Sequence, residues 1–247
     1  MLTKSIKKAI IAHAIADYPR ESCGVIIGKE YMPCKNIASD DAQFEISPID
    51  LVGASKKGEI LAYVHSHPDG STNPSMPDRV QMNLHGKPWI ITNAIEVALH
   101  KPEGYQAPLL GREYYHGLMD CYTLIKDYYQ RELDITLNDY ERKEAWWESA
   151  KSKPLYLDNF KKEGFVAIDT DTIKKHDAIL FRLGKTEHVN HAAVFIGDGS
   201  LSSERTEAVI SDCLILHHPY GRQSLREIYG EQWQRRAHVI LRHKSLM

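Results

Sequence analysis

Residues 60–78, ILAYVHSHPDGSTNPSMPD, decide the fold of the first half of the chain. The apolar start of this stretch predicts a buried strand that ends near His65, and the Pro, Gly, Ser and Asn residues after it predict a loop. Ser75 and Pro77 are typical of the first turn of a helix, which should end near Gly86. A strand, a loop and a helix in this order indicate a domain of mixed α and β structure.

Two imidazoles and one carboxylate in this stretch predict a metal site. His65 and His67 stand two residues apart at the end of the expected strand, where side chains at positions i and i+2 point to the same face. Asp78 follows in the first turn of the expected helix and offers an oxygen ligand. Two histidines and a carboxylate leave one position of a tetrahedral ion open, which is typical of catalytic zinc. The sequence therefore predicts Zn²⁺ held by His65, His67 and Asp78.

The same residues also have a purely structural interpretation. Ser75 and Asp78 have the spacing of a capping box, in which each side chain accepts a hydrogen bond from the backbone of the other. On its own, a His-x-His pair in a chain with 13 histidines is a weak signal for a metal. Glu21, taken alone, is a surface glutamate. The metal prediction therefore depends on the residues acting together.

The composition excludes several classes of protein. The chain has 247 residues, 43% of them hydrophobic, and a formal net charge of −2, so it offers no electrostatic case for nucleic acid or an anionic membrane. No apolar run approaches the ~20 residues that span a bilayer, so we expect no membrane-spanning segment. The start of the chain, with Lys7 and Lys8 in an amphipathic stretch, is not that of a secretory signal peptide. The cysteines, at positions 23, 34, 121 and 213, form no CxxC pair and indicate a reduced, cytosolic compartment.

The chain divides into two expected domains of an α+β fold, residues 1–108 and 109–247. Pro102, Gly104 and Pro108 indicate the linker between them. The expected helices of the first domain are residues 4–17, 47–57 and 75–86, and its expected strands are residues 25–27, 60–65 and two strands between 89 and 99. In the second domain we expect a helix over residues 120–133 and strands at 178–181, 192–196, 214–216 and 239–241.

A second set of residues predicts thiol chemistry. Cys121 opens the helix of the second domain, where the helix dipole is expected to lower the pKa of the thiol. A nucleophilic cysteine needs a histidine as base and a third group that orients this histidine. His191 begins an expected strand, and either His217 or His218 is the third group. The structural alternative is that Cys121 is a small core residue and that each histidine is structural or solvated.

The first half of the chain resembles the JAMM (Mov34/MPN) metalloprotease family. The motif His65-x-His67, seven residues, Ser75, two residues and Asp78 matches its signature, and residues 19–28 resemble its first strand, which begins with a catalytic glutamate. The resemblance covers residues 1 to about 105 and implies a cytidine-deaminase-like α/β fold. It also implies zinc bound by His65, His67 and Asp78, with Glu21 as general base and later acid, and Ser75 stabilising the oxyanion. Cys23 is then a packing residue.

The second half, residues 110–247, resembles the NlpC/P60 cysteine peptidases, whose papain-like fold packs the cysteine helix on a sheet that bears the histidine. The resemblance implies Cys121 as nucleophile, His191 as base and His217 as the third polar residue, with His218 as its nearest rival. The chain departs from the family at three places. They are Tyr122, where the family usually has Ser, His176, where a turn glycine is usual, and an apparent insertion over residues 202–213.

A JAMM-like domain in front of an NlpC/P60-like domain resembles the tail tip assembly proteins of lambda-like siphophages. This resemblance implies a hydrolase whose partners are other phage tail tip proteins and whose expected substrate is bacterial peptidoglycan, while the net charge of the chain predicts no nucleic-acid partner. Its expected place is the host cytoplasm during assembly, or the tail tip of the virion. Two alternatives stay open: an assembly factor that processes a tail protein or has no catalysis, and a bacterial ubiquitin-like-modifier system, which leaves the thiol domain unexplained.

Overall fold

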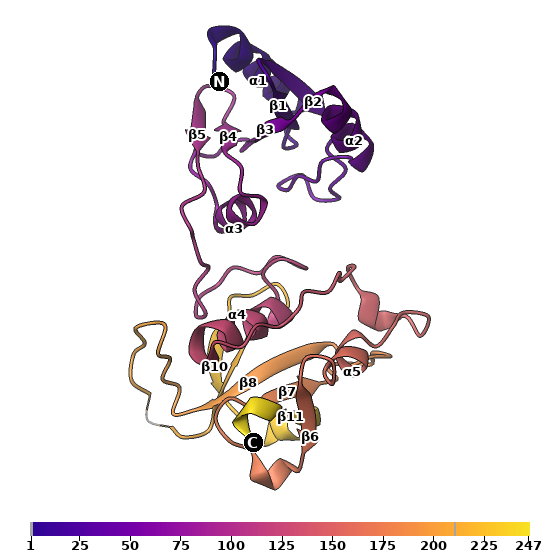
Figure 1. The fold of residues 1–247 in the computed structure, drawn as a ribbon, viewed down its shortest axis with the longest axis vertical. Coiled ribbons are helices and arrows are strands. Elements are labelled where there is room, and N and C mark those ends of the chain that lie inside the picture. Colours follow the sequence, from indigo (N-terminus) through magenta and orange to yellow (C-terminus); the bar gives the residue numbers. More distant parts are fainter. Residues whose placement is uncertain (1, 210) are drawn as a thin grey trace. The chain divides into compact units, whose positions relative to one another are not determined.

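The computed structural model describes residues 2–209 and 211–247. It divides into two compact units, one that ends at Gln106 and one from Ala107 to Met247 (Figure 1). Each unit combines helices with one sheet, which confirms the expected α+β class. Within this described part of the chain, no helix is long and apolar enough to cross a membrane.

The first unit is built on a five-stranded sheet in the order β2-β1-β3-β4-β5. The strands are β1 (Cys23–Ile27), β2 (Glu30–Cys34), β3 (Ile60–Ser66), β4 (Trp89–Thr92) and β5 (Val97–His100), and the helices are α1 (Lys4–Asp17), α2 (Pro48–Lys57) and α3 (Met76–His85). Strands β3 and β4 are parallel and the other pairs are antiparallel. Since a parallel pair needs a crossover, α3 makes the connection between β3 and β4.

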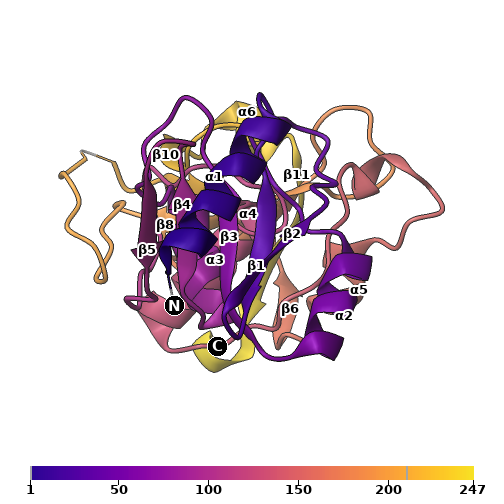
Figure 2. The same cartoon turned by 90° about the horizontal axis from the view of Figure 1, so that it is seen from above.

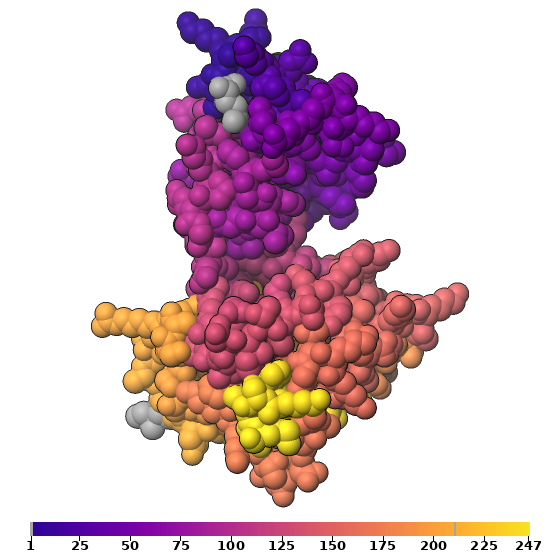
Figure 3. Space-filling model, viewed as in Figure 1, coloured from indigo at the N-terminus to yellow at the C-terminus, as the bar shows by residue number. Residues whose placement is uncertain are grey.

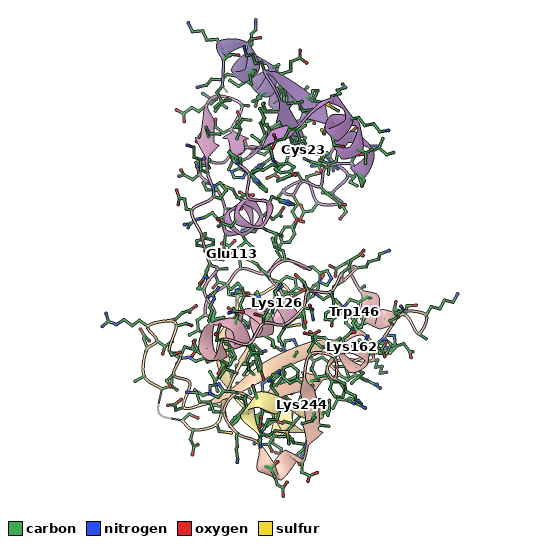
Figure 4. The ribbon with its side chains drawn as sticks, in the orientation of Figure 1. Cys23, Glu113, Lys126, Trp146, Lys162 and Lys244 are labelled. Carbon is green, nitrogen blue, oxygen red and sulfur yellow. The ribbon has the colours of Figure 1, made fainter. Side chains whose placement is uncertain are left out.

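Helices cover both faces of this first sheet. α1 lies across one face (Figure 2), where Ile6 and Ile10 pack against Ile26 of β1. On the opposite face, Val25 and Ala54 belong to a separate core cluster beneath α2. Cys23 is fully buried in this second cluster, and Figure 4 marks its place within the sheet. The alternation of side chains along β1 thus supplies two hydrophobic cores from one strand.

The second unit has a six-stranded antiparallel sheet in the order β10-β9-β8-β7-β11-β6. Its strands are β6 (Phe165–Ile168), β7 (Ala178–Phe181), β8 (His191–Gly197), β9 (Leu214–His217), β10 (Leu225–Ile228) and β11 (Ala237–His243). Its helices are α4 (Cys121–Leu133), α5 (Leu155–Asn159) and α6 (Glu231–Gln234), with 3-10 turns at Trp146–Glu148, Thr170–Thr172 and Lys244–Leu246. This arrangement places the first turn of α4 beside the sheet.

The two faces of the second sheet carry different cores. On one face, Leu124 and Ile125 of α4 pack against Ala192 and Val194 of β8. On the other face, Ala193 and Phe181 pack with Trp233 of α6. The expected helices and strands of both domains are present, and the structure adds β2, β6, β10 and the short helices α5 and α6.

Residues 202–213, where an insertion is expected, lie in the long connection between β8 and β9, and residue 210 of this segment lies outside the described residues. The described part of the connection projects from the body of the second unit in the space-filling view (Figure 3). The guanidinium of Arg226 on β10 anchors this connection by donating to the carbonyl oxygens of Gly199, at 2.8 Å, and Glu207, at 3.0 Å. After this connection, β9 pairs with β8 in an antiparallel register.

Candidate active sites

The first unit brings His65, His67 and Asp78 together. His65 lies near the end of β3, His67 is one residue past this strand, and Asp78 is in the first turn of α3. The two Nε2 atoms are 2.9 Å apart, and the Asp78 carboxylate oxygens lie 3.4 Å from His65 Nε2 and 3.2 Å from His67 Nε2. Among the residues that the structure describes, these three form the group whose side chains could hold a metal ion.

The donor atoms of this cluster fit a tetrahedral cation. Two donors that each lie about 2.0–2.1 Å from one ion are about 3.3 Å apart at tetrahedral angles, close to the separations found here. His67 Nδ1 lies 2.9 Å from the carbonyl oxygen of Ser71, which holds the proton on Nδ1 and leaves Nε2 bare. His65 is fully buried and stacks on Phe44, which fixes the orientation of its ring. The cluster is therefore preorganised as a site of two nitrogens and one carboxylate.

Glu21 lies beside this cluster. The antiparallel register sets Cys23 opposite His65, and continuing it by two residues sets Glu21 opposite His67. The Ser66 hydroxyl accepts the backbone N–H of Ser22, at 2.7 Å, and ties the start of β1 to the end of β3. The pKa of the Glu21 carboxyl is raised to about 7: burial is the largest cause, the charge of His67 opposes it, and the carboxylate of Asp78 acts in the same direction as burial. A buried carboxyl with a pKa near neutrality is suited to receive and return a proton.

Ser75 and Asp78 form the capping box of α3. The Ser75 hydroxyl accepts the backbone N–H of Asp78, at 3.3 Å, and the Asp78 carboxylate accepts that of Ser75, at 2.7 Å. Burial alone would raise the pKa of Asp78, but hydrogen bonds from His65 and His67 lower this pKa well below its usual range. The structural and metal-binding interpretations of Asp78 are therefore compatible, because its carboxylate takes part in both arrangements.

In the second unit, Cys121 is the first residue of α4, after its N-cap Asp120. Its sulfur lies 3.1 Å from the hydroxyl of Tyr156 on α5 and against the backbone of Ala192, the residue that follows His191. No hydrogen bond joins Cys121 and His191 among the described residues. The expected low pKa of Cys121 is wrong for this structure: burial, followed by the nearby Asp120 carboxylate, raises the pKa of the thiol to about 11.

The two histidines of the thiol site are hydrogen-bonded to each other. His191 Nε2 on β8 lies 2.9 Å from His217 Nδ1 on the neighbouring strand β9. The ring of Trp233 lies 4.9 Å from that of His217, measured between centroids, and shields the pair from water. Burial lowers the pKa of His191 to about 3. The imidazole of His191 is therefore neutral at physiological pH.

The structure joins His217, and not His218, to His191. His218 is fully buried elsewhere, with its ring 5.3 Å from that of Tyr114 and close to the backbone of Asp120 and Arg112. Two contacts of the site had no signal in the sequence: Tyr156 beside the thiol, and Glu227, whose carboxylate lies 2.9 Å from His217 Nε2. Both come from segments far from Cys121 in the sequence.

Comparison with known proteins agrees with both halves of this description. Residues 3–103 match the family of prokaryotic homologues of the JAB domain, and residues 111–242 match the NlpC/P60 family. The tail tip assembly protein K of Escherichia phage N15 is 34% identical over 245 residues, which cover 96% of this chain and 94% of that protein. The protein of the same name from Escherichia phage lambda is 36% identical over 203 residues, covering 81% of this chain and 90% of that protein. The chain therefore belongs to the family of phage tail tip assembly proteins K, with a JAB-like domain followed by an NlpC/P60 peptidase-family domain.

Proposed function

We propose that this tail tip assembly protein is a hydrolase with two peptidase sites, and that its thiol site cuts the stem peptides of peptidoglycan. The observation that carries the proposal is the hydrogen-bonded and shielded pair His191–His217, together with the contact of the Cys121 thiol with the backbone of Ala192, the residue that follows His191. A nucleophile, a base and a group that orients the base are the three parts that thiol hydrolysis requires.

In the resting thiol site the nucleophile and the base are both uncharged, because Cys121 is protonated and His191 is not. In the attack, the proton of Cys121 passes to Nδ1 of His191 while sulfur bonds to the carbonyl carbon of the peptide. His191 then gives this proton to the leaving amine, and an acyl-enzyme remains. A water molecule then loses a proton to His191 and attacks the acyl carbon, the bond from carbon to sulfur breaks, the carboxyl product is released, and His191 returns the proton to the sulfur of Cys121.

For the first unit, we propose a zinc-dependent peptidase or isopeptidase site in which His65, His67 and Asp78 hold the ion. Bound zinc supplies Lewis acidity, which polarises a carbonyl oxygen and acidifies water. Glu21 takes up the proton of the attacking water and returns it to the leaving amine. Ser75 lies at the edge of the site, where we assign it a part in stabilising the oxyanion, although its hydroxyl also caps α3. The support for this proposal is the mutual fit of the three ligand side chains.

The partners that we propose are other tail tip proteins, with the host cytoplasm as the place of assembly and the virion tail tip as the place of action on the wall. The membership in the family of tail tip assembly proteins supports partners in the phage tail. The residues of the thiol site support peptidoglycan of the cell wall as the substrate. Tyr122 donates its hydroxyl to the carbonyl oxygen of Asn138, at 2.6 Å, so this side chain is held beside the site in place of a smaller one. We therefore expect a narrower position for the amino end of the stem peptide.

Digestion followed by mass spectrometry tests the proposal. Purified peptidoglycan and purified tail proteins are each incubated with the wild type, Cys121→Ala, Glu21→Gln and the control Cys213→Ala. We expect muropeptide cleavage that persists in a chelator and in Cys213→Ala but is lost in Cys121→Ala. Cleavage of a tail protein instead of muropeptides would show that the enzyme processes a tail protein and does not hydrolyse the cell wall. No cleavage of either substrate would leave the protein as a non-catalytic assembly factor.

A further inference from the structure

A carboxylate extends the pair of imidazoles in the thiol site. His217 uses both ring nitrogens: Nδ1 lies 2.9 Å from His191 Nε2, and Nε2 lies 2.9 Å from an oxygen of Glu227. Glu227 belongs to β10, the edge strand next to β9. The register sets Leu225 directly opposite His217, so Glu227, two residues later, lies on the same face and diagonal to the imidazole. Sheet register thus brings the carboxylate to the histidine.

The hydrogen bonds along this chain of groups determine where the protons are. An ionised carboxylate only accepts hydrogen bonds, so the proton of His217 must be on Nε2. A neutral His217 then has a bare Nδ1, which accepts a proton from Nε2 of His191. This leaves Nδ1 of His191 without a proton. That tautomer is the one that can accept the proton of the thiol.

The surroundings favour the neutral form of His217. Burial lowers the pKa of His217 and the positive charge of Arg222 acts in the same direction, against the opposing effect of Glu227. The other titratable group that acts on His191, besides His217, is His218, which lowers its pKa as well. The His217 side chain is 1% exposed and that of Glu227 is 40% exposed, so the carboxylate links a buried imidazole to the surface of the sheet.

We propose that Glu227 is a positioning residue of the thiol site, which fixes the tautomer of His217 and, through it, that of His191. Without this acceptor, the proton of His217 is free to move to Nδ1. Nδ1 would then donate to Nε2 of His191, and the proton of His191 would move to its own Nδ1. A base with a proton on that nitrogen cannot take another from Cys121. The inference rests on the proposed peptidase function for its effect on rate, whereas the tautomers belong to the resting protein.

Nitrogen NMR of the full chain, labelled with ¹⁵N-histidine, tests the tautomers directly. In the wild type we expect His191 and His217 to be neutral and to carry their protons on Nε2. Glu227→Gln should keep this pattern, because its amide oxygen still accepts a hydrogen bond, whereas Glu227→Leu should shift protons to Nδ1 in both rings. The matched control is Glu231→Leu, an exposed residue of α6 whose carboxylate pairs with Arg235 instead of an imidazole. A wild-type His191 protonated on Nδ1, or unchanged tautomers in Glu227→Leu, would overturn the proposal.

Kinetics with a soluble muropeptide supply the second measurement. We expect Glu227→Leu to lower kcat on the order of 10²-fold with KM nearly unchanged, and Glu227→Gln to restore most of the rate. Glu227→Gln could instead lose as much kcat as Glu227→Leu while its histidines keep the wild-type tautomers. That result would show that the charge of Glu227, and not its role as an acceptor, sets the rate, and it would contradict the proposal. If the wild type cleaves no muropeptide but the tautomers respond as expected, the positioning role holds and the proposed function fails.

Discussion

Asp78 accepts the backbone N–H of Ser75, at 2.7 Å, with the same carboxylate oxygen that lies 3.2 Å from Nε2 of His67. The cap of α3 and the candidate metal centre therefore share an atom. A helix that starts at a fixed residue holds its first-turn side chains in fixed directions, so the capping box places Asp78 toward the imidazoles. Local stability of this helix and the geometry of the cluster are thus coupled.

A variant that removes only the helix cap measures its contribution to stability apart from the candidate metal centre. Ser75→Ala deletes the hydroxyl that accepts the Asp78 N–H, and we expect the free energy of unfolding to fall by about 1 kcal/mol. The measurement is urea unfolding in a chelator, which removes any contribution from a metal. The control is Ser55→Ala, an exposed position inside α2, where the change should stay within about 0.5 kcal/mol. Equal losses in the two variants would show that the capping box contributes nothing particular.

Metal analysis of the purified protein tests the cluster itself. We expect about one zinc ion per chain in the wild type and a loss of most of it in His67→Ala, because two remaining ligands do not complete a tetrahedral site. The control is His85→Ala, an exposed histidine at the end of α3. Full zinc content in His67→Ala would remove this residue from the ligand set.

The carboxyl of Glu21 is expected to serve chemistry without binding the ion. Glu21→Gln keeps the size of the side chain and removes the proton acceptor, so zinc content should stay at the wild-type level. Any metal-dependent hydrolysis should fall by about 10²–10⁴-fold. Glu30→Gln, at the exposed start of β2, is the control. A variant Glu21→Gln that retains the wild-type rate would make Glu21 a structural residue.

The sequence predicted the central elements of both sheets but missed three strands, β2, β6 and β10. All of them are edge strands. A central strand is covered on both sides and both faces, so it needs a run of apolar residues such as Ala178–Phe181, which the sequence shows plainly. An edge strand such as β10 is partly exposed and carries Arg226 and Glu227, so its sequence lacks that run.

His176 shows how a departure from the family pattern is accommodated. It has a φ of 79°, in the left-handed region that favours the glycine usual at this turn. The hydroxyl of Tyr128 lies 2.7 Å from Nδ1 of His176, and that of Tyr129 donates to its carbonyl oxygen. Two tyrosines of α4 therefore hold the turn that precedes β7. The sequence showed the departure, but only the structure shows these contacts.

The sequence was sufficient to predict which residue types stand at the candidate sites and at what spacing. It was not sufficient to predict their pKa values. A cysteine at a helix N-terminus is a local feature, and the sequence therefore predicted a lowered pKa. The raised pKa of Cys121 comes from burial and from Asp120, and burial depends on how Tyr156 and β8 pack over the helix. Glu227 was missed for a similar reason, because its contact depends on strand register.

The reactivity of the cysteines tests this correction. With iodoacetamide near neutral pH, we expect slow labelling of Cys121, because its thiol has a raised pKa although the residue is partly exposed like Cys213, and little labelling of Cys23 and Cys34, which are buried. Between pH 7 and 10, the labelling rate of Cys121 should rise about tenfold per pH unit, since the thiolate fraction grows in this way below a pKa of about 11. Peptide mapping by mass spectrometry follows each cysteine separately. Rapid labelling of Cys121 at pH 7 would instead indicate a thiolate–imidazolium pair.

The ion pair between Asp120 and Arg142 should make the stability of the second unit depend on pH. Burial alone would raise the pKa of Asp120, but Arg142, 2.8 Å away, and the backbone N–H groups of Thr123 and Gly117 lower this pKa overall. A depressed carboxyl pKa contributes stability above the pKa of the unfolded chain, about 3.9, and loses it as the pH falls through the folded value. Asp120→Asn keeps a residue that caps helices well, and it removes the charge together with one of the two acceptor oxygens, which receive the N–H groups of Thr123, Gly117 and Arg142. We expect it to cost about 3 kcal/mol at pH 7, because it leaves the buried guanidinium with Asp139 as its remaining charged partner, besides the carbonyl oxygens of Gly117 and Tyr140.

The difference in unfolding free energy between the wild type and Asp120→Asn should therefore be constant from pH 7 to about 5 and shrink below about pH 4. Other carboxyl groups titrate in both proteins, so their contributions cancel in this difference. The control is Asp134→Asn at the other end of α4, where the aspartate is exposed, adopts the left-handed conformation that asparagine also tolerates, and accepts a hydrogen bond from Gln130. Urea unfolding at each pH gives both differences. If the difference in unfolding free energy between the wild type and Asp120→Asn stayed the same down to pH 3, the charge of Asp120 would not stabilise the N-terminus of α4, the helix that carries Cys121.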